Sequence, residues 1–261
     1  MELPAQRWHE ALERRGSRRR FQPAAPAQGL LHRLDALCRE FRPFGAVRAV
    51  LLRQAPPDLF RGVLGAYGSV KGAPCCLVVA GSGARAAEAG YVGEGAVLEA
   101  TALGLGTCWV AGLFRPESLG GWGAGPEGLG EGERVWAVSP VGTPAPRKTV
   151  EERLMGAVAR SGTRKGSEGI APGSAGWPEW ARAGVEAARR APSALNRQPW
   201  RFSWEGGRVV LGADGPDTHG IPKRLDCGIA MLHFEVGARW AGRAGRWRML
   251  PDPLVAEFVP E

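Results

Sequence analysis

A cluster of arginines near the start of the chain could bind a phosphate group. Residues 14–21 read Arg-Arg-Gly-Ser-Arg-Arg-Arg-Phe, so five arginines and one hydroxyl surround Gly16. Guanidinium groups and a serine hydroxyl both donate hydrogen bonds to phosphate oxygens, which suits them to hold a phosphate dianion. Two alternatives stay open for this segment alone: a solvated basic arm and a patch that binds nucleic acid.

A second polar segment lies late in the chain. Residues 191–202 read Ala-Pro-Ser-Ala-Leu-Asn-Arg-Gln-Pro-Trp-Arg-Phe, and the two prolines stiffen this loop. Ser193, Asn196 and Gln198 place a hydroxyl and two amides close together. Amides donate and accept hydrogen bonds, as the polar edge of a planar heterocycle requires. The alternative is an ordinary polar turn anchored by a buried Trp200.

A glycine-rich segment at residues 104–114 reads Gly-Leu-Gly-Thr-Cys-Trp-Val-Ala-Gly-Leu-Phe. It superficially suggests a phosphate-binding glycine loop, but it follows a predicted helix instead of opening one after a strand. That order excludes a Rossmann dinucleotide motif. A helix that ends in glycine and passes into an apolar strand fits better. Gly112 would then let the backbone approach a flat ligand closely.

The composition is that of a globular protein with a basic balance. The 34 Lys and Arg outnumber the 26 Asp and Glu, giving a formal net charge of +8 among 261 residues. This charge favours anionic partners such as nucleotides or nucleic acid, without choosing among them. Arg greatly outnumbers Lys, which suits phosphate binding but is equally explained by a GC-rich genome.

The cysteines and the apolar segments indicate a cytoplasmic protein without a metal site. The five cysteines are odd in number and show no zinc-site spacing. Cys75 and Cys76 fall in an apolar run, so we interpret them as small core residues in a reducing compartment. The polar N-terminus lacks the apolar region of a secretory signal. No apolar stretch approaches the roughly 20 residues needed to span a bilayer.

Alternating helices and strands must position the three polar segments. Period and turn residues predict a buried central strand at 74–80, a Gly/Ser-rich linker at 161–176 and a surface loop at 120–132. Residues 205–207 are a hairpin signal between strands. The remaining elements are predicted as helices at 8–15, 30–39, 90–106, 151–159, 178–190 and 227–240, and as strands at 46–53, 134–141, 201–204 and 209–211.

The two long apolar helices resemble each other. Residues 90–106 align with residues 226–242, and Glu99, Ala102 and Gly106 then coincide with identical residues. This faint repeat hints that the chain contains two diverged copies of one unit.

Together the three polar segments resemble the FMN-dependent nitroreductase family. Its opening pattern Arg-Arg-Ser-x-Arg-x-Phe is matched by Arg15, Ser17, Arg19 and Phe21, with Gly16 in place of the second Arg. Its Ala-Pro-Ser-x-x-Asn-x-Gln-Pro-Trp-x-Phe pattern is matched at every defined position of residues 191–202. Its Gly-Leu-Gly-Thr-x-Trp-x-Gly-x-Phe pattern is matched with one residue inserted before Gly112, and residues 141–148 look like its late strand and basic tail.

The order of these motifs departs from the family, where the Pro-Ser loop comes soon after the arginine motif. The resemblance implies an α+β nitroreductase-like fold, with a central, largely antiparallel sheet flanked by helices. Family members are usually homodimers that hold each flavin between subunits. Here residues 1–160 carry the arginine and glycine motifs and residues 161–261 carry the Pro-Ser loop. We therefore expect two diverged half-units in one chain, an internal pseudo-dimer that is monomeric and holds one flavin between its halves.

The resemblance also implies roles for individual residues. Arg15 and Ser17 would hold the FMN phosphate, Arg19 the phosphate or the N1–O2 edge, and Arg147 the phosphate more weakly. Backbone N–H groups of Ala111 and Gly112 would face N5 and O4. The second half would contact the ring and ribityl chain through Pro192, Ser193, Ala194, Asn196 and Gln198. No catalytic side chain is expected, because the flavin carries the chemistry.

The implied activity is transfer of hydride from NADH or NADPH, through flavin N5, to a small oxidised acceptor such as a nitroaromatic or a quinone. One alternative is a flavin-binding sensor or carrier without turnover. A nucleic-acid binder is another, but we expect neither a nucleic-acid nor a membrane partner. His233, in the last predicted helix, could be a general acid or a packed core residue.

Overall fold

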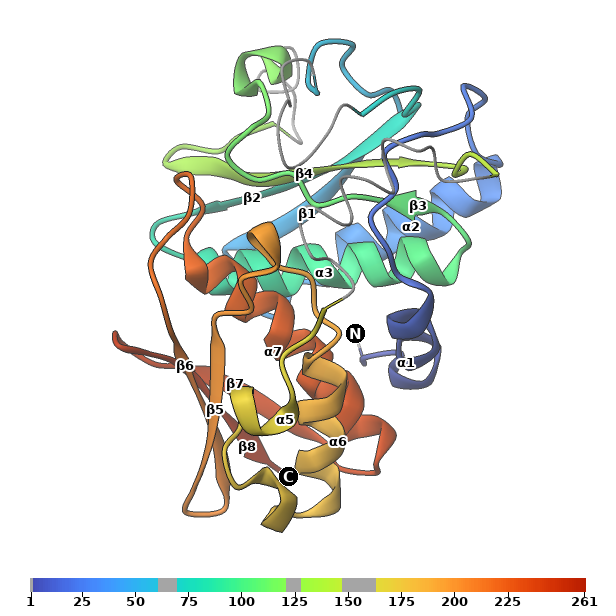
Figure 1. Ribbon diagram of the computed structural model, residues 1–261. Coiled ribbons are helices and arrows are strands. Elements are labelled where there is room, and N and C mark those ends of the chain that lie inside the picture. Colours follow the sequence, from blue (N-terminus) through green and yellow to red (C-terminus); the bar gives the residue numbers. More distant parts are fainter. Residues whose placement is uncertain (1, 61–69, 121–127, 147–162) are drawn as a thin grey trace.

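The computed structural model describes residues 2–60, 70–120, 128–146 and 163–261. It has an α+β fold, as expected, in which two four-stranded antiparallel sheets have long helices between them (Figure 1). The strands are thus divided between two sheets instead of sharing one central sheet. Residues before 147 build one sheet, and residues after 162 build the other.

The first sheet has the order β1-β2-β4-β3. Its second strand is internal because its apolar run is buried on both faces. Helix α3 connects β2 to β3, the second and third strands in chain order. It packs on the sheet, since the Cβ of an alanine at Gly93 would lie 2.8 Å from Val79 Cγ2. The elements are α1 (Ala5–Arg14), α2 (Gln28–Glu40), β1 (Val47–Leu52), β2 (Cys75–Ser82), α3 (Ala86–Ala102), β3 (Gly106–Thr107), the 3₁₀ turn η1 (Pro116–Leu119) and β4 (Glu133–Gly142).

The second sheet has the corresponding order, β5-β6-β8-β7, and its long helix α7 again connects the second and third strands. The predicted hairpin turn is present, and both of its glycines, Gly206 and Gly207, have positive φ. The elements are α5 (Ser167–Ile170), η2 (Ser174–Gly176), α6 (Glu179–Ala188), η3 (Ala194–Asn196), β5 (Trp200–Glu205), β6 (Arg208–Ala213), α7 (Lys223–Trp240), β7 (Gly245–Met249) and β8 (Leu254–Pro260).

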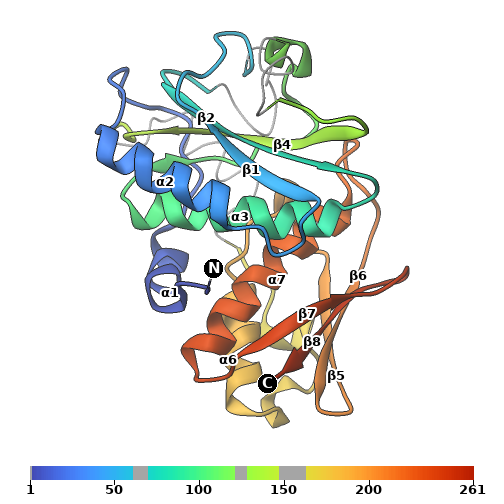
Figure 2. The same ribbon diagram turned by 180° about the vertical axis from the view of Figure 1, so that it is seen from behind.

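Helices α3 and α7 cross in direct backbone contact at the centre of the molecule (Figure 2). A Cβ atom on Gly90 would lie 1.9 Å from the Leu225 carbonyl oxygen, and one on Gly228 would lie 1.8 Å from the Ala87 oxygen. Only glycine permits this approach. Every residue of α3 up to Thr101 is buried, which explains the small residues that the sequence shows there.

The structure corrects several expectations. The predicted linker contains α5 and η2, and it packs against the rest of the second half, because Ile170 and Ala171 are fully buried. The chain does not close with a helix; β7 and β8 follow α7. Helix α3 begins and ends about four residues earlier than predicted. It ends at Ala102 because the next residues turn into β3. The predicted helix at 151–159 and most of the predicted loop at 120–132 lie outside the described residues.

The cysteines are free and buried, which confirms that Cys75 and Cys76 are core residues. Within the described residues, no helix combines the length and apolar character that a membrane span requires.

Candidate functional site

The arginine segment lies directly beside the glycine segment. Ser17 forms an isolated parallel bridge with Thr107 on the edge strand β3, and the Arg18 N–H donates to the Thr107 carbonyl oxygen at 2.8 Å. The Arg18 side chain donates to the Ala145 carbonyl oxygen. The predicted phosphate-binding segment is therefore held in extended form against the end of the first sheet, next to the residues expected to face the flavin ring.

Gly112 lies where the first half meets the second. Its φ is +75°, a conformation that favours glycine, and an added Cβ would lie 3.0 Å from the His219 carbonyl oxygen. Gly112 is exposed and the preceding Ala111 is buried. The Gly112 backbone is thus open to solvent on one side and close to the second half on the other.

The Pro-Ser loop is a rigid turn held by its own side chains. Leu195, Asn196 and Gln198 all have positive φ, at 50°, 57° and 48°. Such backbone persists only where surrounding contacts fix it. The Ser193 hydroxyl accepts the Gln198 N–H at 3.0 Å, and the Gln198 amide donates to Asn196 Oδ1 at 3.2 Å. The polar side chains therefore bond to one another across the turn.

A buried carboxylate on α7 holds this loop in place. Asp226 accepts the Ala194 N–H with both oxygens at 3.2 Å and the Arg197 Nε at 2.7 Å. Burial raises the pKa of Asp226 to about 6, although Arg197 and the Ala194 N–H act in the opposite direction. Asp226 was not among the residues identified from sequence. Its position four residues into a helix gave no signal, because its partners are some thirty residues away.

Residues 163–165 pack on the Pro-Ser loop and form hydrogen bonds with its side-chain amides. The Asn196 amide donates to the Thr163 carbonyl oxygen at 2.7 Å, and Gln198 Oε1 accepts the Lys165 N–H at 2.9 Å. The Arg164 side chain donates to Asn196 Oδ1. These three residues were missed from sequence. A signal did exist: Gly162-Thr163-Arg164-Lys165 repeats the pattern Gly16-Ser17-Arg18-Arg19.

The charges of two guanidinium groups from opposite halves, Arg15 and Arg164, act on each other here. Burial, and secondarily the positive charge of Arg15, lower the pKa of Arg164 to about 10. In the described part of the chain, no carboxylate pairs with Arg164. The side chain of Arg15 is only 8% exposed, and its buried Nε has no hydrogen-bond partner there. The positive charge of Arg164, added to that of the buried Arg15, gives this region an affinity for negative charge.

Arg15 has one carboxylate within reach, and that carboxylate belongs to a buried network. Its Nε lies 3.8 Å from Glu94 Oε1, while Glu94 Oε2 accepts the indole N–H of Trp109 at 2.6 Å. His233 Nε2 lies 2.8 Å from Glu94 Oε1, and both side chains are fully buried. His233 is therefore a packed core residue, one of the two roles that the sequence left open.

The structure brings most of the predicted residues together but assigns them no ligand contact. Arg15, Ser17 and Arg19 lie along one extended segment, and Ala111 and Gly112 follow the edge strand that this segment pairs with. Pro192, Ser193, Ala194, Asn196 and Gln198 form the rigid turn of the second half. Their roles toward a flavin stay predictions. Arg147 lies outside the described residues. Among the described side chains, no cluster of His, Cys, Asp and Glu could hold a metal ion.

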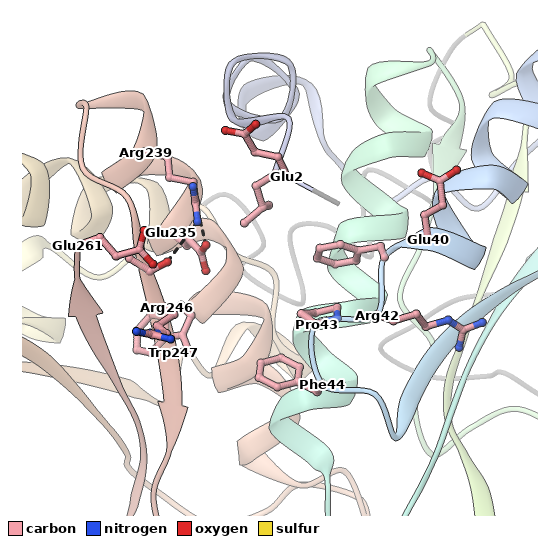
Figure 3. Close-up of a pocket in the computed structure, with 13 residues that line it drawn as sticks. Glu2, Glu40, Arg42, Pro43, Phe44, Glu235, Arg239, Arg246, Trp247 and Glu261 are labelled. Carbon is pink, nitrogen blue, oxygen red and sulfur yellow. Dashed lines mark hydrogen bonds and ion pairs between the residues drawn. The ribbon is translucent and has the colours of Figure 1, made fainter.

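The structure also has a cavity between the halves that is lined by none of the residues named above. The connection from α2 to β1 and the edge strand β7 bound a cavity of about 320 Å³ (Figure 3). We call it the Phe41 cavity. Pro43 and Phe44 lie across it from Trp247 and from the ion pair between Arg239 and Glu235, and Phe41 also lines it. Its other lining residues are Glu2, Leu3, Glu40, Arg42, Gly245, Arg246 and Glu261.

The side chains of the Phe41 cavity do not suit a flavin phosphate. Phenylalanine and proline stand where the Pro-Ser loop has its hydroxyl and amides. Glu235 is buried in the wall, and its pKa is raised by burial and by the nearby charge of Glu261. Glu235 also pairs with Arg239 at 2.9 Å, so this arginine is not left with an unbalanced charge that a phosphate would compensate.

Comparisons with known proteins give one family throughout. A crystal structure of a putative nitroreductase from Thermotoga maritima is similar at 20% identity, covering 97% of this chain and 93% of that one, with a TM-score of 0.62. A nitroreductase with bound FMN from Desulfitobacterium hafniense is 19% identical over 54% of this chain and 91% of its own, with a TM-score of 0.42.

A curated Mycobacterium tuberculosis protein, named Putative NAD(P)H nitroreductase acg, is 35% identical over 78 residues. That match spans 28% of this chain and only 24% of the curated protein. The family model described as Putative TM nitroreductase matches residues 8–238, which is most of the chain. The chain therefore belongs to this nitroreductase family.

Proposed function

We propose that this protein is an FMN-dependent oxidoreductase that holds one flavin between its two halves. The observation that carries the proposal is a pair of arginines from opposite halves: Arg15, whose buried Nε has no hydrogen-bond partner in the described part of the chain, and Arg164, whose pKa is lowered by burial and by the charge of Arg15. A phosphate dianion would balance these charges. Ser17 and Arg19 lie on the same extended segment as Arg15 and would complete the phosphate site, with Arg147 as a further candidate.

The remaining features of the site fit the other end of an FMN molecule. Ala111 and Gly112 offer backbone N–H groups beside the second half, and Gly112 has no side chain of its own to cover them. The rigid turn at residues 192–198 presents polar groups from the other side. Buried polar groups that are already ordered bind a ligand at a smaller entropic cost. The amides of Asn196 and Gln198 now bond to residues 163–165, so their contact with the flavin would pass through or displace that segment.

Bound FMN would supply hydride transfer between NADH or NADPH and a small oxidised acceptor such as a nitroaromatic or a quinone. The chain's own contribution would be to bind and orient the cofactor and to place positive charge near it. Cations beside the flavin favour the reduced form, which carries additional negative charge. No side chain of the described site needs to act as an acid or a base.

The two halves, residues 1–160 and 161–261, are proposed to be diverged copies of one unit. Their sheets have corresponding strand orders, and each places its long helix between the second and third strands. Because the arginine segment and the Pro-Ser loop lie in different halves, one complete site forms within a single chain. We propose a monomer with small-molecule partners. The free, buried cysteines suit the reducing conditions of the cytoplasm.

Purified protein tests this proposal directly. We expect a flavin spectrum in the visible range, one FMN released per chain, and oxidation of NADH or NADPH with a nitroaromatic or quinone acceptor. Colourless protein that does not bind added FMN would contradict the proposal. Bound FMN without turnover would indicate a sensor or carrier. Salt-dependent binding of DNA or RNA by the colourless protein would favour the nucleic-acid alternative.

A further inference from the structure

Glu94 is a buried carboxylate on α3 that touches three separate parts of the molecule. Its Oε2 accepts the Trp109 indole N–H at 2.6 Å, and its Oε1 lies 2.8 Å from His233 Nε2 and 3.8 Å from Arg15 Nε. Trp109 belongs to the glycine segment, Arg15 to the arginine segment and His233 to the second half. No solvent reaches Glu94, so these contacts are its entire polar environment among the described residues.

The partners of His233 determine where the hydrogen atoms lie. His233 Nδ1 is 3.2 Å from the Ala187 carbonyl oxygen, which can only accept a hydrogen bond. Nδ1 must therefore carry a hydrogen. The contact of Nε2 with Glu94 Oε1 then requires one proton between these two atoms. The pair holds that proton away from water, and it fixes the orientation of the Glu94 carboxylate from the second half.

The orientation of Glu94 in turn determines where the glycine segment lies. A Cβ atom on Gly93 would meet the Trp109 ring at 2.4 Å, so the indole packs on the bare backbone of α3. Its N–H donates to the neighbouring Glu94. Gly112 is three residues beyond this anchor. On the other side, Ala187 lies near the end of α6, four residues before the Pro-Ser loop begins.

We propose that Glu94, oriented by His233, is a positioning residue that keeps the arginine segment, the glycine segment and the second half in register for flavin binding. The proposal rests on the proposed function. Glu94 does not touch the flavin; it acts through Arg15 and Trp109. Charge alone predicts the opposite effect, because a carboxylate near Arg15 weakens the attraction of that region for a phosphate.

The test compares Glu94→Gln with Glu99→Gln in the full chain. Glu99 is a matched control one and a half turns along the same helix. It is 2% exposed, and it accepts a tryptophan N–H, from Trp8 at 3.0 Å, and an arginine donor, Arg7 at 2.7 Å. Glu99 therefore has the same chemistry without contact to the site. Flavin fluorescence titration gives the Kd for FMN, and visible circular dichroism reports the surroundings of the bound ring.

We expect Glu94→Gln to weaken FMN binding about tenfold and to change the visible dichroism, while Glu99→Gln changes neither. Trp109→Phe keeps an aromatic ring but removes the donor to Glu94 and the part of the indole that packs on Gly93. It should weaken binding several-fold, so it replaces Glu94→Gln should that variant not fold. Unchanged or tighter binding by the tested variant overturns the proposal, as does an equal loss in Glu99→Gln. If wild-type protein binds no FMN, the proposed function fails as well, and the two failures are thereby distinguished.

Discussion

The candidate site and the Phe41 cavity both take residues from the two halves, yet their side chains differ in kind. The Phe41 cavity lies between the α2-to-β1 connection of one half and the edge strand β7 of the other. The candidate site has two guanidinium groups whose charges act on each other, and a turn that carries a hydroxyl and two amides. The Phe41 cavity has aromatic rings and a buried carboxylate that is already paired with Arg239.

The difference lies in the side chains, and from it we expect a phosphate to bind at the candidate site and not in the Phe41 cavity. Arg239 is neutralised by Glu235 at 2.9 Å, whereas Arg164 has no such partner among the described residues. An unbalanced cation attracts an anion, and a balanced one does not. Variants that change one region and spare the other test this comparison.

The largest effect is expected from Arg15→Gln. Loss of a buried guanidinium that faces a phosphate should weaken FMN binding about 100-fold, or roughly 2.7 kcal/mol. Flavin fluorescence titration measures it. Arg246→Gln, in the wall of the Phe41 cavity, is the control and should leave the Kd unchanged. Equal losses in both variants would remove the distinction between the two regions.

The next effect is expected from Arg164→Gln, which removes the cation that the second half contributes. FMN binding should weaken about tenfold. Thermal stability without FMN should change little, because the loss of the Arg164 hydrogen bond to Asn196 is offset by relief of its repulsion with Arg15. Unchanged affinity would show that the phosphate is held by the first half alone.

A third prediction separates backbone conformation from close approach. Gly104 and Gly112 both have positive φ, at +80° and +75°. An alanine Cβ meets nothing at Gly104 and the His219 oxygen at Gly112. Gly104→Ala should cost about 1 kcal/mol of unfolding free energy and spare flavin binding. Gly112→Ala should cost about twice as much and weaken FMN binding. Similar values by denaturant titration would argue against the close approach of the halves there.

The smallest expected effect is a pH dependence that arises from Asp226. As the pH falls below about 6, this carboxyl gains a proton and loosens its hold on Ala194 and Arg197, so FMN binding should weaken several-fold. Stability changes in the opposite sense. Between the ordinary value of 3.8 and about 6 the folded state binds more protons, so the free energy of unfolding falls as the pH rises through that window.

Asp226→Asn is the control for this pH dependence. It should flatten both trends between pH 4 and pH 6, measured by FMN titration and by denaturant unfolding. Trends that persist unchanged in the variant would assign them to another group.

Local sequence patterns predicted much of the fold but few of the contacts between residues of the candidate site. The apolar run at β2, the paired glycines of the hairpin and the small residues of α3 each follow from neighbouring residues alone. The strands β7 and β8 were missed because β7 alternates arginine with Trp247 in an unremarkable short run. The contacts of Arg164 with Asn196, and of Glu94 with His233, join residues far apart in sequence. Such contacts depend on tertiary packing, which residue spacing does not encode.

Both sheets belong to one chain, and their central helices cross through glycines. A site between separate subunits is lost when the subunits dissociate on dilution. Two halves joined in one chain keep a constant effective concentration near each other. Each substitution also occurs once per molecule instead of twice. A change in one half therefore leaves the other half as it was, so the two regions between the halves can differ in their side chains within one molecule.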